Sequence, residues 1–292
     1  MSQTHRIGID LGGTKIEAAL LSPGGAITWR RRTPTPAAYP DIIAAMAGLI
    51  RAVETELSIQ ATVGVGIPGT LSPATGLVKN ANTQALIGHP LDTDLGSALG
   101  RPIRVENDAN CFALSEASDG AGAGHACVFG VILGTGCGGG IVVDGRVLTG
   151  RNRIAGEWGH TPLPWPQPDE YPQPRCWCGQ HGCLELYLSG PNLARAGGTP
   201  SAHDLVGSPD PRARNALSRH TDRLARGLAV IMNILDPDVI VLGGGLSNMD
   251  HLYQDLPARM ARYVFSDVTA TPVLRNRHGD SSGVRGAAWL WP

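Results

Sequence analysis

Apolar residues in this chain gather in short runs that are separated by glycine-rich turns. Two segments share one order: Arg6 to Leu21 and Val128 to Val143 each hold an apolar strand, a Gly/Thr loop and a second strand. A tight turn follows each pair, Pro23-Gly24-Gly25 in the first and Asp144-Gly145 in the second. The repetition predicts two lobes of related design, each opening with a β-hairpin. Chance similarity in a chain with 39 glycines is the alternative.

The remaining pattern alternates strands with helices, which indicates an α/β protein. Helices are predicted over residues 42–57, 107–118, 224–235 and 280–292, and strands over 62–67, 102–106 and 239–242. Six prolines between Thr161 and Arg175 exclude regular structure there and predict a loop. We therefore expect an N-terminal lobe over residues 1–118 and a C-terminal lobe over residues 119–279, with the last helix packing back on the first lobe.

Composition limits the class of protein. Hydrophobic residues make up 42% of the 292 positions and charged residues 17%, which is typical of a globular protein large enough for two lobes. The net charge of −1 disfavours nucleic acid as a partner, and no apolar run approaches the ~20 residues of a membrane span. No signal peptide precedes the first strand, so we expect a cytoplasmic protein whose six cysteines stay reduced.

Three glycine clusters at strand ends are candidates for phosphate binding. Glycine lets backbone N–H groups approach an anion closely, and a threonine hydroxyl adds a donor. The candidates are Asp10, Gly12, Gly13, Thr14 and Lys15 in the first cluster, Gly134, Thr135 and Gly136 in the second, and Gly243, Gly244 and Gly245 in the third. Asp10 would repel a phosphate unless Mg²⁺ or its water lay between them. Tight turns are the alternative at each cluster, but three together favour a nucleotide such as ATP.

An acidic residue stands where a predicted strand passes into a helix. In Glu106-Asn-Asp-Ala-Asn110, either Asn107 or Asp108 suits the N-cap of that helix. Asp108 also suits a general base, because phosphoryl transfer needs one acceptor for the proton of the attacking hydroxyl. Both roles are compatible if Asn107 caps the helix and Asp108 faces a cleft between the lobes.

Cysteine and histidine residues are clustered in the second lobe. Cys176, Cys178 and Cys183 lie within eight residues, and His160 precedes them by a proline-rich loop. Three thiolates and one imidazole suit a structural Zn²⁺ ion with tetrahedral geometry. His181 is a rival fourth ligand, and disulfide pairing is the alternative, although it leaves an odd thiol. We expect a small zinc-bound element over residues 157–185.

Two glutamates flank this cluster. Glu157 lies three residues before the histidine and Glu185 two residues after the last cysteine. Zinc would hold them close together, and carboxylate oxygens accept hydrogen bonds from sugar hydroxyls. Two solvated glutamates are the alternative reading.

The ordered motifs resemble those of the ROK (repressor, open reading frame, kinase) sugar kinases. They are Asp10-Leu-Gly-Gly-Thr-Lys15, Glu106-Asn-Asp-Ala-Asn110, Leu133-Gly-Thr-Gly136, Gly156-Glu-Trp-Gly-His160 and Cys176-x-Cys178-Gly-x-x-Gly-Cys183-x-Glu185, and they span essentially the whole chain. Residues 156–166, 234–248 and 278–291 look most like bacterial fructokinases of the manno(fructo)kinase type. Trp158 stands where many members of the family carry phenylalanine.

The resemblance implies an actin-like (ribonuclease H-like) fold with ATP, Mg²⁺ and sugar between the lobes, and commonly a homodimer. It implies that Asp108 takes the proton from the 6-hydroxyl of a hexose. It also implies sugar contacts from Gly69, Asn107, Glu157, His160 and Glu185, and zinc ligation by the three cysteines. The histidine would then bind zinc through one ring nitrogen and sugar through the other.

We expect from this resemblance an ATP-dependent fructokinase that also acts on mannose or glucose. An N-acetylhexosamine kinase of the same family is the alternative. A sugar-responsive repressor is a remote one, because the first strand starts near His5 and leaves no room for a preceding DNA-binding domain. A non-catalytic sugar- or zinc-binding module would not need Asp10 and Asp108.

Overall fold

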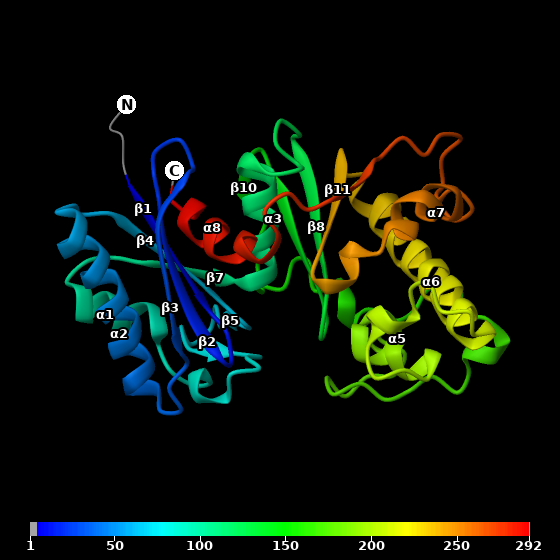
Figure 1. Cartoon of the computed structure of the whole chain (residues 1–292), viewed down its shortest axis with the longest axis horizontal. Helices are drawn as coiled ribbons and strands as arrows, with labels where there is room; N and C mark the ends of the chain where they lie inside the picture. The colour runs from blue at the N-terminus through cyan, green and yellow to red at the C-terminus, as the bar shows by residue number, and fades with distance from the viewer. Residues whose placement is uncertain (1–4, 292) are drawn as a thin grey trace.

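Two five-stranded sheets form the framework of the protein, whose computed structural model describes residues 5–291. The first sheet contains β1 (Arg6–Leu11), β2 (Lys15–Leu21), β3 (Ile27–Pro34), β4 (Thr62–Ile67) and β7 (Arg104–Asn107), in the order β3-β2-β1-β4-β7. The second contains β8 (Cys127–Leu133), β9 (Cys137–Val143), β10 (Arg146–Val147), β11 (Val239–Gly243) and β12 (Val273–Arg275), in the order β10-β9-β8-β11-β12. The sheets belong to two lobes that lie side by side (Figure 1).

Both sheets are paired in the same way. In the first, β1 is antiparallel to β2 and parallel to β4; in the second, β8 is antiparallel to β9 and parallel to β11. The tight turns predicted after each hairpin therefore connect strands of equivalent position. The prediction of two lobes of related design is confirmed, and so is the α/β class.

Helices cover the outer faces of the sheets. The first lobe carries α1 (Tyr39–Leu57), α2 (Leu91–Leu99) and a small ribbon of β5 (Thr70–Leu71) and β6 (Val78–Lys79). The second carries α4 (Glu185–Leu188), α5 (Gly190–Gly197), α6 (Pro211–Leu235) and α7 (Asp250–Met260). The prediction that the long helix begins at Leu224 was wrong. It begins at Pro211, because Asp210 caps the Arg212 N–H and its first half carries many polar residues that hide the apolar face.

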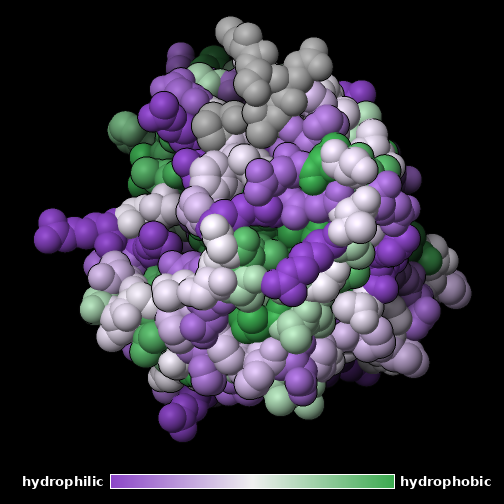
Figure 2. Space-filling model, turned by 90° about the vertical axis from the view of Figure 1, so that its left-hand side faces the viewer, coloured by the Kyte–Doolittle hydropathy of each residue, from purple (hydrophilic) through white to green (hydrophobic). Residues whose placement is uncertain are grey.

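Hydrophilic and hydrophobic residues are mixed on the surface. Figure 2 shows one end of the molecule, the side of the first lobe, on which hydrophilic residues surround a smaller central area of hydrophobic ones. Within residues 5–291, none of the helices has the length and apolar character needed to span a bilayer.

Two helices lie between the sheets, α3 (Asp108–Asp119) and α8 (Ser282–Trp289) (Figure 1). They cross at backbone contact, because a Cβ on Gly286 would lie 1.6 Å from the carbonyl oxygen of Cys111. A Cβ on Gly8 would lie 1.8 Å from the Val284 carbonyl oxygen, so α8 also lies directly on β1. Only glycine permits such approaches. The lobe boundaries expected from the sequence stay a prediction.

The chain passes between the lobes twice. The first crossing, residues 120–126, leads from α3 to β8, and the second crossing, residues 276–281, leads from β12 to α8. Figure 1 shows the second crossing as the segment that returns from the second lobe to α8. The two crossings lie at the same end of α3, since side chains of that end contact both.

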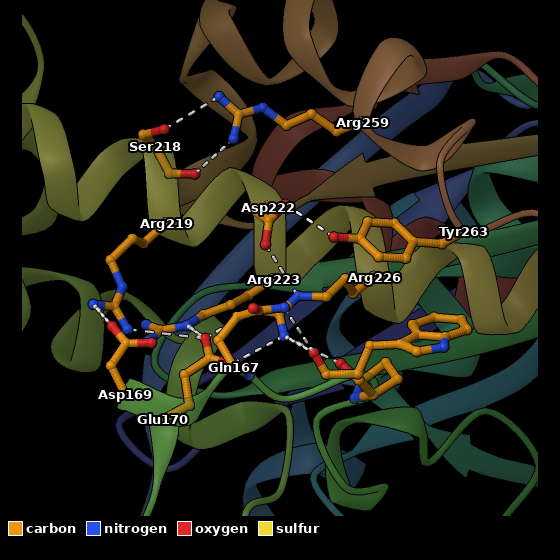
Figure 3. A network of polar contacts seen from close by, with 12 residues as sticks. Gln167, Asp169, Glu170, Ser218, Arg219, Asp222, Arg223, Arg226, Arg259 and Tyr263 are labelled. Atoms are coloured by element: carbon orange, nitrogen blue, oxygen red, sulfur yellow. Dashed lines mark hydrogen bonds and ion pairs between the residues drawn. The ribbon is translucent and has the colours of Figure 1, made fainter.

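The proline-rich segment 161–175 is fastened to α6 by a buried ionic network (Figure 3). Glu170 binds the guanidinium of Arg226 through both oxygens, at 2.8 and 2.9 Å, and accepts a hydrogen bond of 2.7 Å from Arg223. Arg226, which is 1% exposed, also donates to the carbonyl oxygens of Pro164 and Trp165. Burial alone would raise the pKa of Glu170, but the hydrogen bonds from the two arginines lower it to about 2. The segment is irregular as predicted, apart from one 3-10 turn at Pro168–Glu170.

Candidate active site

Asp108 is the first residue of α3, directly after β7. The side-chain oxygen of Asn107 accepts hydrogen bonds from the N–H groups of Ala109 and Asn110, at 2.9 and 3.3 Å, so Asn107 is the N-cap. Its amide group donates to the carbonyl oxygen of Gly69 at 3.3 Å. One Asp108 oxygen also accepts a hydrogen bond from the Ala109 N–H at 2.8 Å, and the carboxylate faces the cavities described next.

A central cavity of about 330 Å³ lies against the start of α3. Residues of both lobes form its wall. Those expected from the sequence to bind sugar all line it: Gly69, Asn107, Asp108, Glu157, His160 and Glu185. Gly134, Thr135 and Gly136 of the second glycine cluster line it as well. The structure therefore brings the predicted acid, the glutamates and one glycine loop to a single hollow.

Two further hollows adjoin the central cavity. The Asp10 cavity, of about 250 Å³, shares Asp108 with the central cavity and includes Gly244 and Gly245. The His203 cavity, of about 450 Å³, shares Gly134 and Thr135 with the central cavity and Gly245 with the Asp10 cavity. Shared walls place the three hollows around one point, so a long ligand can occupy more than one of them.

Part of the predicted phosphate-binding set lies outside these three cavities. Gly12 N–H donates to the Lys15 carbonyl oxygen at 2.9 Å, which makes the first cluster a hairpin turn with Gly13 and Thr14 at its exposed tip. The Lys15 ammonium lies 4.0 Å from Glu17 and its side chain is 47% exposed. Gly243 is buried, since a Cβ there would lie 2.3 Å from the Phe112 ring. Of the first cluster, only Asp10 lines a described cavity.

Three aspartates line the Asp10 cavity: Asp10, Asp108 and Asp280. Two of them have raised pKa values. Burial, followed by the negative charge of Asp10, raises the pKa of Asp108 to about 6. Burial and the charge of Glu17 likewise raise the pKa of Asp10 to about 6. Two buried carboxylates with raised pKa values at one hollow are suited to a divalent cation, whose charge would favour their ionised forms.

The Cys/His residues come together as expected. The candidate ligand atoms of His160, Cys176, Cys178 and Cys183 all lie within 4.8 Å of one another. The Nδ1 atom of His160 lies 3.8 Å from the sulfur of Cys176, and the sulfurs of Cys178 and Cys183 are 3.6 Å apart. A tetrahedron with Zn–S bonds of about 2.3 Å has edges of about 3.8 Å, so this donor set fits Zn²⁺. All six cysteines are free thiols, which contradicts disulfide pairing, and His181 is not in the cluster.

The cluster lies beside the central cavity and fixes side chains of its wall. Glu185 accepts hydrogen bonds from the Cys137 N–H at 3.1 Å and from the Trp177 indole N–H at 2.8 Å. The Trp177 ring meets the His160 ring edge-on at a centroid distance of 4.9 Å. Burial raises the pKa of Glu157, while the nearby His160 lowers it. The loop that carries the candidate zinc ligands therefore also orients Glu185.

Several polar residues of these cavities were missed from the sequence. Asn80 and Asn82 line the central cavity, and Asn276 and Asp280 line the Asp10 cavity. The pair Asn80-Ala-Asn82 follows the short ribbon β5–β6, and a positive φ of 56° at Asn80 marks a turn. Asp280 belongs to a capping-like Asp-Ser-Ser run, which we interpreted only as a helix start.

Comparison with known proteins identifies the class. The family model of the ROK family matches residues 6–292. The chain therefore belongs to the ROK family, and the resemblance to its sugar kinases is confirmed. The actin-like, two-lobed fold follows from the same relationship.

Individual relatives show which kinds of sugar kinase the chain is similar to. The N-acetyl-D-glucosamine kinase of Pectobacterium atrosepticum is 40% identical over 298 residues, which cover 97% of each chain. The solved ROK hexokinase of Thermus thermophilus is 33% identical and superimposes with a TM-score of 0.86, covering 98% of this chain and 97% of that one. The ROK glucokinase of Streptomyces griseus, solved with glucose and AMPPNP, is 28% identical with a TM-score of 0.76 and covers 98% of both chains.

The expected similarity to fructokinases was wrong. The curated relatives from Pectobacterium atrosepticum and other bacteria, 39–40% identical over 97% of this chain, are N-acetyl-D-glucosamine kinases. Of the flanking segments that suggested a fructokinase, residues 234–248 and 278–291 contribute no side chain to the central cavity's wall, and residues 156–166 contribute only Glu157 and His160.

Proposed function

We propose that the protein transfers the γ-phosphate of ATP to the 6-hydroxyl of N-acetyl-D-glucosamine. The observation that carries the choice of sugar is the 40% identity, over 97% of the chain, to an N-acetyl-D-glucosamine kinase. Membership of the ROK family and the likeness to a glucokinase solved with AMPPNP support ATP-dependent phosphoryl transfer. The three adjoining cavities offer room for both substrates.

Asp108 is the proposed general base. Its carboxylate borders both the central cavity and the Asp10 cavity, where an acceptor hydroxyl and a phosphate would meet. A pKa raised to about 6 lets it take a proton near neutral pH and still be ionised beforehand. Capping by Asn107 fixes the turn that carries it.

The nucleotide is assigned to the other two hollows. Its phosphates would lie in the Asp10 cavity against Gly244 and Gly245, and its base in the His203 cavity. Mg²⁺, when bound, neutralises phosphate charge, and Asp10 is the residue that would hold it or its water. Gly134 and Thr135, which line both the central and the His203 cavities, would contact the phosphates between them.

The sugar is assigned to the central cavity. Asn107, Glu157, His160 and Glu185 would bind its hydroxyls, and the backbone near Gly69 would bound it on the first lobe. Zn²⁺, when bound at the three cysteines and Nδ1 of His160, ties the loop into one shape and leaves the other imidazole nitrogen for sugar. The metal is then structural and does no chemistry.

A substrate panel tests the proposal. ATP-dependent phosphorylation is measured for N-acetylglucosamine, N-acetylmannosamine, glucose, mannose and fructose, and kcat/KM is compared. We expect the largest kcat/KM for N-acetylglucosamine. A maximum on an unacetylated hexose would overturn the choice of sugar and keep the kinase, whereas turnover of none of them would overturn the kinase itself.

A further inference from the structure

A buried carboxylate outside the proposed chemistry lies where the two crossings meet. Glu116, on the third turn of α3, is 0% exposed. One of its oxygens accepts hydrogen bonds from the N–H groups of Ala121 and Arg277, each at 2.9 Å. Ala121 belongs to the first crossing and Arg277 to the second. A single oxygen atom thus joins both connections between the lobes.

The other Glu116 oxygen binds the second crossing and the first residue of α8. It accepts hydrogen bonds from the His278 N–H at 3.3 Å and from the Ser282 hydroxyl at 2.9 Å. The carboxylate therefore has four donors, which fills the acceptor capacity of an ionised glutamate. A glutamine of the same shape cannot replace it, because its NH₂ group would face N–H or O–H donors.

Asp119 supports the same junction one turn later on α3. It pairs with the imidazole of His278 at 2.9 Å and with the guanidinium of Arg285 on α8. A Cβ on Gly120 would lie 2.3 Å from the Glu116 carboxylate, so the first crossing passes directly over that group. The junction leaves no space for either crossing to shift independently of the carboxylate.

The second crossing and the start of α8 also form a wall of the Asp10 cavity. Asn276, Gly279, Asp280, Ser282 and Gly283 all line that cavity. A Cβ on Gly283 would lie 3.0 Å from an Asp10 oxygen, which places the segment directly against the candidate Mg²⁺ residue. Glu116 itself lines none of the three cavities. Its contacts therefore fix the position of this wall of the Asp10 cavity, although Glu116 lies outside the cavity.

We infer that Glu116 is a positioning residue that sets residues 276–283 for nucleotide binding and couples them to the first crossing. A nucleotide that holds residues 276–283 in place then also holds residues 120–122, which it does not touch. The inference rests on the nucleotide assignment within the proposed function and is independent of the sugar.

Hydrogen exchange of the whole protein tests the coupling. Exchange is followed by mass spectrometry in peptides covering residues 119–125 and 275–283, with and without saturating Mg²⁺-AMPPNP. We expect the nucleotide to slow exchange in both peptides together. Protection of residues 275–283 alone would overturn the coupling. If calorimetry shows that the wild-type protein does not bind AMPPNP, the nucleotide assignment fails instead.

Glu116→Gln tests the carboxylate itself. We expect its Kd for Mg²⁺-AMPPNP to rise about tenfold, since one or two donors lose their acceptor. We also expect faster exchange in both peptides. The matched control is Glu54→Gln, which removes another partly buried carboxylate that accepts from Arg101 and the Ala61 N–H in the first lobe. It should leave the nucleotide Kd within about twofold of wild type, a change that is small on the scale of one hydrogen bond.

The two variants separate positioning from general destabilisation. A Kd that rises equally in both would overturn the inference, and so would an unchanged Kd in a folded Glu116→Gln protein. If that variant does not fold, the wild-type exchange experiment still decides, because it needs no substitution.

Discussion

Replacement of Glu170 by glutamine would remove the negative charge at the centre of the network in Figure 3. The side chain keeps its size and one acceptor oxygen, but Arg226 loses its bidentate partner, and the contacts of Arg223 and Arg226 lose the negative charge that strengthens them. Breaking a buried ion pair by altering one partner costs about 3–5 kcal/mol. Asp222 remains 3.1 Å from the Arg226 Nε atom, so the lower end of that range applies.

The pKa of Glu170 gives a second value for the loss of folding stability in this variant. A shift from the usual glutamate value to about 2 corresponds to about 3 kcal/mol of native-state stabilisation at neutral pH. Because the folded-state pKa is lowered, this contribution is complete above the usual pKa and is lost as the pH falls through about 2. For a protein of this size, about 3 kcal/mol corresponds to a decrease in Tm of roughly 6–12 °C.

Thermal unfolding by calorimetry or circular dichroism, at pH 7 and again near pH 3, measures the decrease in Tm and its dependence on pH. The control is Glu56→Gln, whose partner Arg31 forms an exposed ion pair with side chains 51% and 46% accessible. It should cost under about 1 kcal/mol. Equal Tm values for the two variants at pH 7 would refute the reasoning. A difference that does not shrink at low pH would refute the pKa argument in particular.

Four further predictions concern the active site and the candidate zinc element. Asp108→Asn should leave sugar binding largely intact and lower kcat by roughly 10²–10⁴; near-normal turnover would remove Asp108 as the base. For the wild type, kcat/KM should fall as the pH drops through about 6, because protonated Asp108 cannot accept a proton. Glu157→Gln should move that inflection to lower pH, since the charge of Glu157 raises the pKa of Asp108; an unmoved inflection contradicts the assignment. Cys178→Ser should abolish stoichiometric zinc binding, and verified removal of the metal should have the same consequences for the site. In both cases residues 157–185 should become sensitive to proteolysis and the sugar KM should rise. Full activity without metal would show that zinc does not hold the sugar site.

The sequence predicted those parts of the fold whose interacting residues lie close together along the chain. The hairpins at Arg6–Leu21 and residues 127–143 were found because apolar strands, a glycine loop and a tight turn stand in sequence. The Cys/His cluster was predictable because its three cysteines are close in sequence and His160 precedes them by one loop. The sequence limited the N-cap of α3 to Asn107 or Asp108, and the structure shows that it is Asn107.

Features that depend on distant contacts were not predictable. The glycines at residues 12–13 lie at a hairpin tip and Gly243 lies against the Phe112 ring, positions that the sequence does not reveal. Their part in phosphate binding stays a prediction. Asn80, Asn276 and Asp280 reach the cavities only because a short ribbon and an interlobe crossing fold back on the site. The choice of sugar failed for a related reason, since it depends on which side chains converge in the central cavity and not on a motif.

The position of α8 affects the order in which the protein can assemble on the ribosome. Strands β1 and β4 are made early, but the helix that lies on them, residues 282–289, is made only after the entire second lobe. Ala19 and Leu21 of the first sheet complete their buried cluster only with Val284 and Ala288. Until then, one face of a nearly finished sheet stays uncovered, a condition that favours chaperone binding and slow folding. The first sheet can therefore be fully covered only after α8 has been synthesised.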